Sequence, residues 1–210
     1  MPFDLEAHFG PIDIYLFDQL LRGQIAPGMR VLDAGCGSGR NLIYLLKDGY
    51  DVTAVDADAS AVAAVQRLAA EIVPGFPPDR IRQEPLESLS FPDASFDVVI
   101  CSAVLHFARD DAQFEAMVRG TWRVLKPGGI QIYTVPLIHN RSTRQRMQQT
   151  AEGGVVHLLP PSFHGNEGEF PVVWEFGGDF FEHRKPNITE LDYDNYWQNR
   201  TVFTVVERKP

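Results

Sequence analysis

The stretch that decides the fold is Val31-Leu32-Asp33-Ala34-Gly35-Cys36-Gly37-Ser38-Gly39-Arg40-Asn41. Two apolar residues lead into an acid, and three glycines then alternate with other residues. Glycine loses more conformational entropy on folding than any other residue, so three glycines this close together need a reason. They indicate either a tight structural turn or a ligand that approaches the backbone where a Cβ atom would be in the way.

Short apolar runs alternate with amphipathic stretches along most of the chain, which is typical of a parallel sheet covered by helices. The expected strands in the first two thirds are 30–34, 51–56, 81–83, 96–102 and 130–135. Residues 187–193 and 201–208 alternate as closing strands, and the linker between them is too short for a helical crossover, so we expect them to be antiparallel. The predicted fold class is therefore α/β: a Rossmann-like seven-stranded mixed sheet with helices on both faces and the last strand antiparallel.

Composition limits the partners. The chain has 210 residues and a net charge of −9, which disfavours nucleic acid and anionic membranes because both select Lys and Arg.

Two cysteines, Cys36 and Cys101, form neither a metal-binding pattern nor a disulfide framework. The first ten residues lack the apolar core of a signal peptide, and no apolar run is long enough to span a bilayer. We expect a cytoplasmic monomer or homodimer with no nucleic-acid or membrane partner.

Two ligand types compete for the glycine loop, because ligands of α/β sheets bind at the carboxyl ends of the strands. A dinucleotide fold favours G-x-G-x-x-G, but Arg40 stands where the third glycine of that pattern belongs. Asp33, two residues before the first glycine, suits a ligand with an ammonium group and would repel a pyrophosphate. The residues therefore favour an ammonium-bearing ligand over a dinucleotide.

With Asp33 and this G-x-G-x-G, the sequence resembles the class I S-adenosylmethionine-dependent methyltransferases. The resemblance extends to Asp56 in VTAVDAD, to PDASFDVVICSAVLHF and to VLKPGG. The stretch GCGSGRNLIYLLKDGYDV and the ending FTVVERK are similar to the tellurite-resistance type within this class. The resemblance implies one methyltransferase domain over 1–210. Its expected parts are an N-terminal helix and lid (1–28), a cofactor-binding core (29–136), an insertion on the acceptor side (137–180) and closing strands (181–210).

The resemblance also implies roles for individual residues. Asp56 would accept the ribose hydroxyls, with helix capping as the alternative. Asp33 would hold the amino group directly or through water, with bracing of the loop as the alternative. Gly35 and Gly37 would let the backbone approach the methionine part. Leu86 and Glu87 would line the adenine, with Glu84 as the other candidate acid and a plain loop role as the alternative. The remaining expected cofactor contacts are Cys36, Asn41, Ala57, Ser102 and Ala103.

The implied reaction is transfer of a methyl group from S-adenosylmethionine, by in-line displacement, to a small-molecule acceptor, leaving S-adenosylhomocysteine. A sulfonium-bound methyl is already activated, so orientation does most of the work and no nucleophile motif is needed. His106 is the candidate acceptor contact or acid/base, with a pocket-wall role as the alternative. His139, His157 and His164 have no metal-ligand spacing, so we expect no metal. The rival hypotheses are a non-catalytic S-adenosylmethionine-binding protein and an NAD-dependent oxidoreductase.

Overall fold

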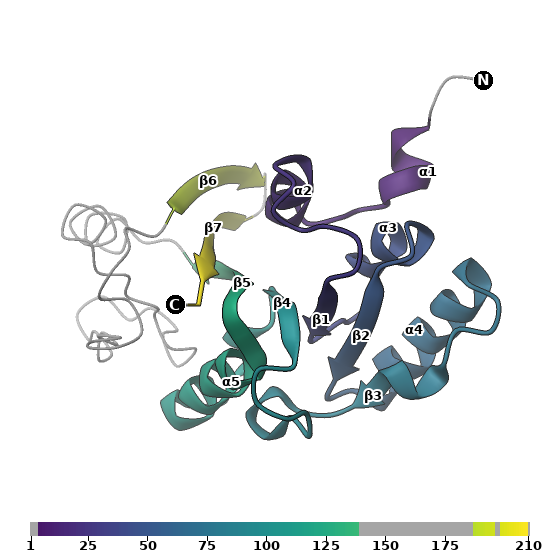
Figure 1. The fold of residues 1–210 in the computed structure, drawn as a ribbon. Helices are drawn as coiled ribbons and strands as arrows, with labels where there is room; N and C mark the ends of the chain where they lie inside the picture. Colours follow the sequence, from purple (N-terminus) through teal and green to yellow (C-terminus); the bar gives the residue numbers. More distant parts are fainter. Residues whose placement is uncertain (1–3, 139–186, 196–197, 210) are drawn as a thin grey trace, which may run out of the picture.

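The computed structural model describes residues 4–138, 187–195 and 198–209 (Figure 1). Five strands pair in parallel in the order β3-β2-β1-β4-β5. They are β1 (Arg30–Ala34), β2 (Asp51–Asp56), β3 (Ile81–Gln83), β4 (Phe96–Ser102) and β5 (Leu125–Ile138). All but one of the residues of β4 are buried, as expected for a central strand of a parallel sheet that helices cover on both faces.

The expected seven-stranded mixed sheet has to be corrected, because the Rossmann-like unit is a five-stranded, all-parallel sheet. The last two strands, β6 (Asn187–Asn195) and β7 (Gln198–Arg208), form a hairpin, and β7 pairs antiparallel with the edge strand β5. The hairpin is thus an addition at one edge and not part of the parallel unit that the helices cover. The sequence pattern predicted the strands of the hairpin but not this division.

Helices cover both faces of the parallel sheet (Figure 1). Five α-helices are described: α1 (Leu5–Phe9), α2 (Ile14–Leu21), α3 (Leu42–Lys47), α4 (Ala59–Ile72) and α5 (Asp111–Val124). Three short 3-10 helices lie in the connections: η1 (Pro78–Arg80), η2 (Leu86–Ser88) and η3 (Leu105–Phe107). Asp58 and Asp110 cap the N-termini of α4 and α5, where their carboxylates accept backbone N–H groups.

The core has two halves, one on each side of the sheet. On one side, apolar residues of α2, α3 and α4 pack on Val31, Val98 and Ile100. On the other side, α5 and the two short helices η2 and η3 pack on Leu32 and Val99. Consecutive strand residues therefore point to opposite halves, as the two-residue period of a strand requires.

Some predictions concern residues outside the part of the chain that the structure describes. The predicted insertion over 137–180 falls almost entirely outside them, as do His139, His157 and His164. None of the described helices is both long and apolar enough to cross a membrane.

Candidate active site

The three glycines after β1 have two different functions. All three have positive φ: Gly35 at 83°, Gly37 at 51° and Gly39 at 78°. A Cβ atom on Gly35 would lie 2.4 Å from Val104 Cγ2, and one on Gly39 would lie 2.9 Å from Leu68 Cδ2. A Cβ on Gly37 would meet nothing within 4 Å. Gly35 and Gly39 therefore allow close packing of the turn, whereas Gly37 faces open space.

Asp56, the last residue of β2, is fixed beside this turn. Its Oδ2 accepts the Gly37 N–H at 2.8 Å, and its Oδ1 accepts the Asp58 N–H at 2.9 Å. Each carboxylate oxygen can accept more than one hydrogen bond, so both oxygens keep a lone pair for a ligand. The backbone bonds orient the carboxylate before any ligand arrives.

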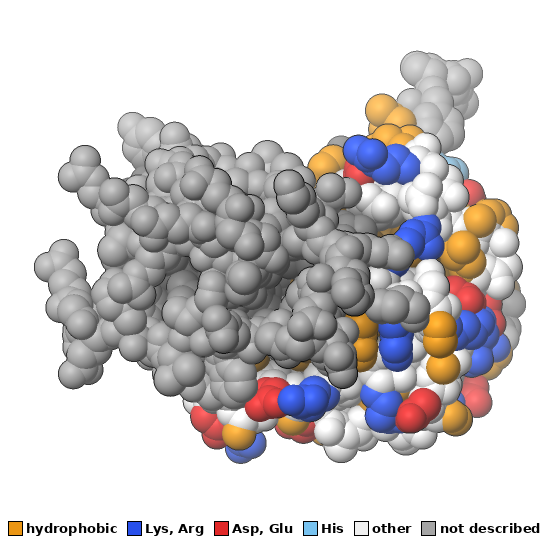
Figure 2. Space-filling model, turned by 60° about the vertical axis from the view of Figure 1, so that its left-hand side comes forward, with side chains coloured by type: hydrophobic (Ala, Val, Ile, Leu, Met, Phe, Trp, Pro, Cys, Tyr) orange, Lys and Arg blue, Asp and Glu red, His pale blue; other side chains and the backbone are white. Residues whose placement is uncertain are grey.

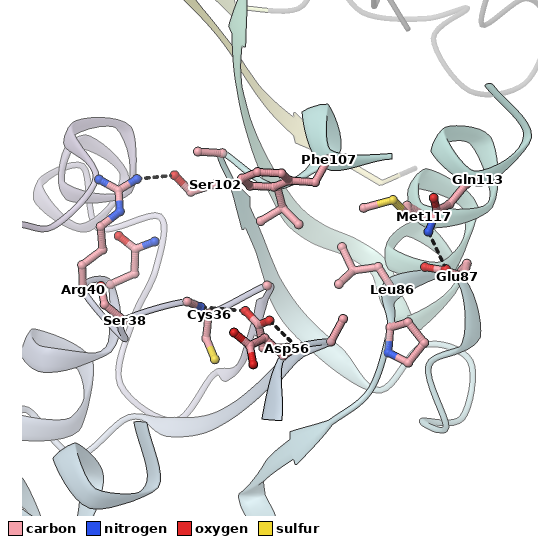
Figure 3. A pocket seen from close by; sticks show the side chains of 18 residues that line it. Cys36, Ser38, Arg40, Asp56, Leu86, Glu87, Ser102, Phe107, Gln113 and Met117 are labelled. Atoms are coloured by element: carbon pink, nitrogen blue, oxygen red, sulfur yellow. Dashed lines mark hydrogen bonds between the residues drawn. The ribbon is translucent and has the colours of Figure 1, made fainter. Parts of the chain in front are cut away.

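A cavity of about 500 Å³ opens between the glycine turn, the end of β2, η2, η3 and α5 (Figure 3). This volume lies within the usual range of small-molecule sites, roughly 300–1,000 Å³. Most of the residues predicted for the cofactor line it: Gly35, Cys36, Gly37, Asn41, Asp56, Ala57, Leu86, Glu87, Ser102 and Ala103. Eight further residues line the cavity that were not predicted as cofactor contacts: Ser38, Arg40, Asp58, Pro85, Val104, Phe107, Gln113 and Met117.

Two predicted residues do not line the cavity. Asp33 lies beneath the turn with its side chain buried. His106 is half-buried on η3, and its ring packs on the neighbouring Phe107 with the centroids 4.1 Å apart. Phe107, which is 74% exposed, lines the cavity in its place. The acid/base role of His106 therefore stays a prediction.

Asp33 is the most perturbed acid near the cavity. Burial is the main cause that raises its pKa from 3.8 to about 7; Arg40 opposes the rise, and the nearby charges of Asp56 and Asp13 add to it. Its Oδ2 is buried and has no hydrogen-bond partner among the described residues. A carboxyl group in this state favours a cationic neighbour, because a positive charge would restore its ionised form.

The far wall of the cavity comes from η2 and α5. Leu86 and Met117 are apolar and buried, and Gln113 Nε2 donates to Glu87 Oε1 at 2.8 Å (Figure 3). Glu84, the other candidate acid, is absent from the lining and accepts both the N–H and the hydroxyl of Ser90. Of the two acids, Glu87 is the one at the cavity.

The opposite end of the cavity is polar. Arg40 Nη2 donates to Ser102 Oγ at 2.6 Å, and Ser102 Oγ donates to Asp13 Oδ2 at 2.7 Å. The Asp13 N–H donates to Asn41 Oδ1 at 2.9 Å. Three elements therefore meet here: the start of α2, the start of α3 and the end of β4.

Neither cysteine is activated as a nucleophile. Burial raises the pKa of the Cys36 and Cys101 thiols, which keeps them protonated and weakly nucleophilic. No cluster of three metal-ligating side chains occurs in the described part of the chain.

The cavity lies within a segment that known proteins share. The methyltransferase-domain family matches residues 32–133, which include every residue of the cavity lining. This match, over just under half of the chain, supports the resemblance to the class I S-adenosylmethionine-dependent methyltransferases. An uncharacterized methyltransferase from Synechocystis sp. is 37% identical over 108 residues, 50% of this chain and 46% of its own length. The ubiquinone biosynthesis O-methyltransferase of Paracidovorax citrulli is 35% identical over 133 residues, 60% of this chain and 53% of its own.

Solved structures share the fold of this chain. A methyltransferase from Methanosarcina mazei aligns with a TM-score of 0.55 at 23% identity, covering 90% of this chain and 96% of its own. The cyclase SpnF aligns with a TM-score of 0.61 at 16% identity, covering 94% and 81%. A cyclase with this fold means that the fold alone does not determine the reaction. The chain also spans only about half the length of the curated relatives it matches.

Proposed function

We propose that this protein binds S-adenosylmethionine in the cavity and transfers its methyl group to a small-molecule acceptor. The observation that carries the proposal is the order of groups around the cavity. An apolar wall with Glu87 lies at one end, the Asp56 carboxylate in the middle and the Arg40–Ser102 pair at the other end (Figure 3). This order matches a base, a ribose and an amino acid joined in line.

At the nucleoside end, Leu86 and Met117 would contact the flat faces of adenine. Asp56 would accept the two ribose hydroxyls with the lone pairs that its backbone bonds leave over. Charge-assisted hydrogen bonds of this kind contribute about 1.5–3 kcal/mol each. Asp56 therefore contributes a large share of the binding free energy in this proposal.

At the amino-acid end, Asp33 would stabilise the ammonium group through water or through its charge, and Arg40 would bind the carboxylate. The charges of Asp13 and Asp56 both act on Asp33, and Arg40, which lies 3.4 Å from Asp13, is the cation that opposes them. The surplus of negative charge favours a ligand with a net positive charge. It disfavours the pyrophosphate of a dinucleotide, which argues against an NAD-dependent oxidoreductase.

The cofactor would supply an activated methyl group, and the protein would hold the acceptor lone pair in line with it. Ala103, Val104 and Phe107 form the cavity wall beyond the end of β4 and would contact the acceptor. A small molecule is favoured over a nucleic acid, since basic and acidic side chains are mixed on the described surface in Figure 2. His106 as a base, the monomeric or dimeric state and the cytoplasmic location remain predictions.

Binding can be tested by thermal unfolding with S-adenosylhomocysteine or NAD. A ligand present at 100 times its dissociation constant stabilises the folded state by about 2.7 kcal/mol. We expect this shift with S-adenosylhomocysteine, its loss in Asp56→Ala and its retention in Glu71→Ala, a change on the exposed end of α4. Stabilisation by NAD alone would overturn the proposal.

Methyl transfer needs a second experiment, because a non-catalytic binding protein would pass the first. The protein is incubated with S-adenosylmethionine and panels of phenols, amines, thiols and oxyanions, and released S-adenosylhomocysteine is measured. An acceptor that raises the release above the acceptor-free rate, with Asp56→Ala as the inactive control, would establish the reaction. Tight binding without turnover on any panel would favour the binding protein.

A further inference from the structure

Asp13 lies just before α2, far from the glycine turn in the sequence, yet its side chain contacts Ser102 and Arg40, two residues that line the cavity. The side chain is only 6% exposed. Its Oδ2 accepts from Ser102 Oγ at 2.7 Å and lies 3.4 Å from Arg40 Nη2. Its Oδ1 accepts the Tyr15 N–H at 3.0 Å and thereby caps α2. One oxygen therefore serves the helix and the other serves the site.

Arg40 is the group on which this carboxylate acts. Both of its hydrogen bonds, to Ser102 and to Asp13, use the single nitrogen Nη2. A guanidinium carries five N–H donors in one rigid plane, so holding Nη2 restricts where Nε and Nη1 can lie. The side chain is 38% exposed and lines the cavity, so without these bonds it would be free to turn into solvent.

We propose that Asp13 is a positioning residue for cofactor recognition. Through Ser102 it holds the Arg40 guanidinium in the plane that meets the ligand carboxylate, so the N-terminal segment takes part in binding without touching the ligand. Helix capping alone does not explain the arrangement, because capping uses Oδ1 and leaves the buried Oδ2 to Ser102 and Arg40. The inference rests on the proposed function, since it needs a ligand with a carboxylate.

The test compares two probes by isothermal titration calorimetry. S-adenosylhomocysteine has the amino-acid part, whereas 5′-methylthioadenosine keeps the nucleoside and lacks that part. Asp13→Asn retains a good helix cap but removes the charge. We expect affinity for S-adenosylhomocysteine to fall about ten- to a hundred-fold, the usual effect of losing a charge-assisted contact, with methylthioadenosine unchanged. Asp18→Asn, on an exposed part of the same helix, should change neither affinity.

A double-mutant cycle with Arg40→Gln asks whether Asp13 acts through Arg40. We expect Arg40→Gln to weaken S-adenosylhomocysteine selectively, and Asp13→Asn to cause no further loss in that background. The inference would be overturned if the two substitutions lowered the affinity additively, if Asp13→Asn lowered the affinity for both probes equally, or if it lowered neither. If Asp13→Asn does not fold, Ser102→Ala carries the same test, because it removes the hydroxyl that joins the two side chains. An unsubstituted protein that binds neither probe would overturn the proposed function, and the inference with it.

Discussion

At Asp33 the proposed function and the stability of the fold conflict. Because burial raises its pKa from 3.8 to about 7, the folded protein keeps a proton that the unfolded chain has lost between these two values. Stability therefore falls as the pH rises from about 4 to about 7, and the penalty is constant above that. A shift of this size corresponds to about 4 kcal/mol at most, at roughly 1.4 kcal/mol per unit.

Asp33→Asn should remove this penalty and weaken the ligand at the same time. We expect a higher free energy of unfolding at pH 8, by up to about 4 kcal/mol, and little gain near pH 4. The affinity for S-adenosylhomocysteine should fall, because the ammonium loses its anionic neighbour. Urea titrations at both pH values and calorimetry at pH 8 measure the two effects. Loss of stability together with unchanged affinity would show that Asp33 only braces the turn.

The sequence predicted the residues of the site that belong to one local pattern. Asp56 and the glycines could be placed because a strand, a turn and a helix follow one another within a few residues. Arg40 and Asp13 could not be assigned, because their partner Ser102 is 62 and 89 residues away in the chain. His106 and Phe107 are neighbours on a short 3-10 helix, and only its orientation decides which of them lines the cavity.

At the scale of elements, the cavity wall depends on how closely α5 approaches η2. Gly120 stands at that contact: a Cβ atom there would lie 2.1 Å from the carbonyl oxygen of Leu86. The neighbouring connection is held by Arg123, which donates to the carbonyl oxygens of Leu89 and Phe91. The backbone of η2 is therefore placed by α5, and Leu86 and Glu87 are placed with it.

Gly120→Ala should displace η2 and widen the adenine end of the cavity. In an exposed helix this change stabilises by about 1 kcal/mol, so a loss of stability would report the collision. We expect the free energy of unfolding to fall by about 1–3 kcal/mol, as at overpacked sites. Both S-adenosylhomocysteine and methylthioadenosine should bind more weakly. Thermal unfolding and calorimetry measure these effects. A stabilised variant with normal affinity for methylthioadenosine would mean that η2 is not held by this contact.

Elements with strong periodicity were predictable, whereas their grouping into a sheet was not. The apolar run FDVVICS and the alanine-rich α4 follow from their own residues. The separation into a five-stranded parallel unit and an edge hairpin depends on β5 pairing with β7, strands that are distant in the chain. β5 also begins at Leu125 rather than at 130, since Leu125 already pairs with Phe96 of β4; the register shifts across the KPGG stretch, and pairing resumes between Ile130 and Val98.

At the scale of the whole molecule, the two ends of the parallel sheet do different work. The carboxyl ends of the strands surround the cavity and carry the perturbed acid. At the opposite end, Asp97 accepts the Arg30 N–H and the Lys126 ammonium group, each at 2.8 Å, and so joins β4 to the starts of β1 and β5. Desolvation opposes ionisation of Asp97, but these two hydrogen bonds still hold its pKa below 3.8.

Asp97→Asn should therefore cost stability without affecting the site. A lowered pKa contributes stability above about pH 4 that is lost as the pH falls through the folded-state value, so the deficit should be present at pH 7 and small at pH 3. We expect the free energy of unfolding to fall by about 1–2 kcal/mol at pH 7; the loss is modest because the Asp97 side chain is partly exposed. The matched change Asp93→Asn, at an ion pair whose acid is 78% exposed, should stay within about 0.5 kcal/mol. Urea titration measures the stability of each variant, and calorimetry measures its affinity for S-adenosylhomocysteine. If Asp97→Asn lowered that affinity as much as Asp56→Ala does, the two ends of the sheet would not be independent.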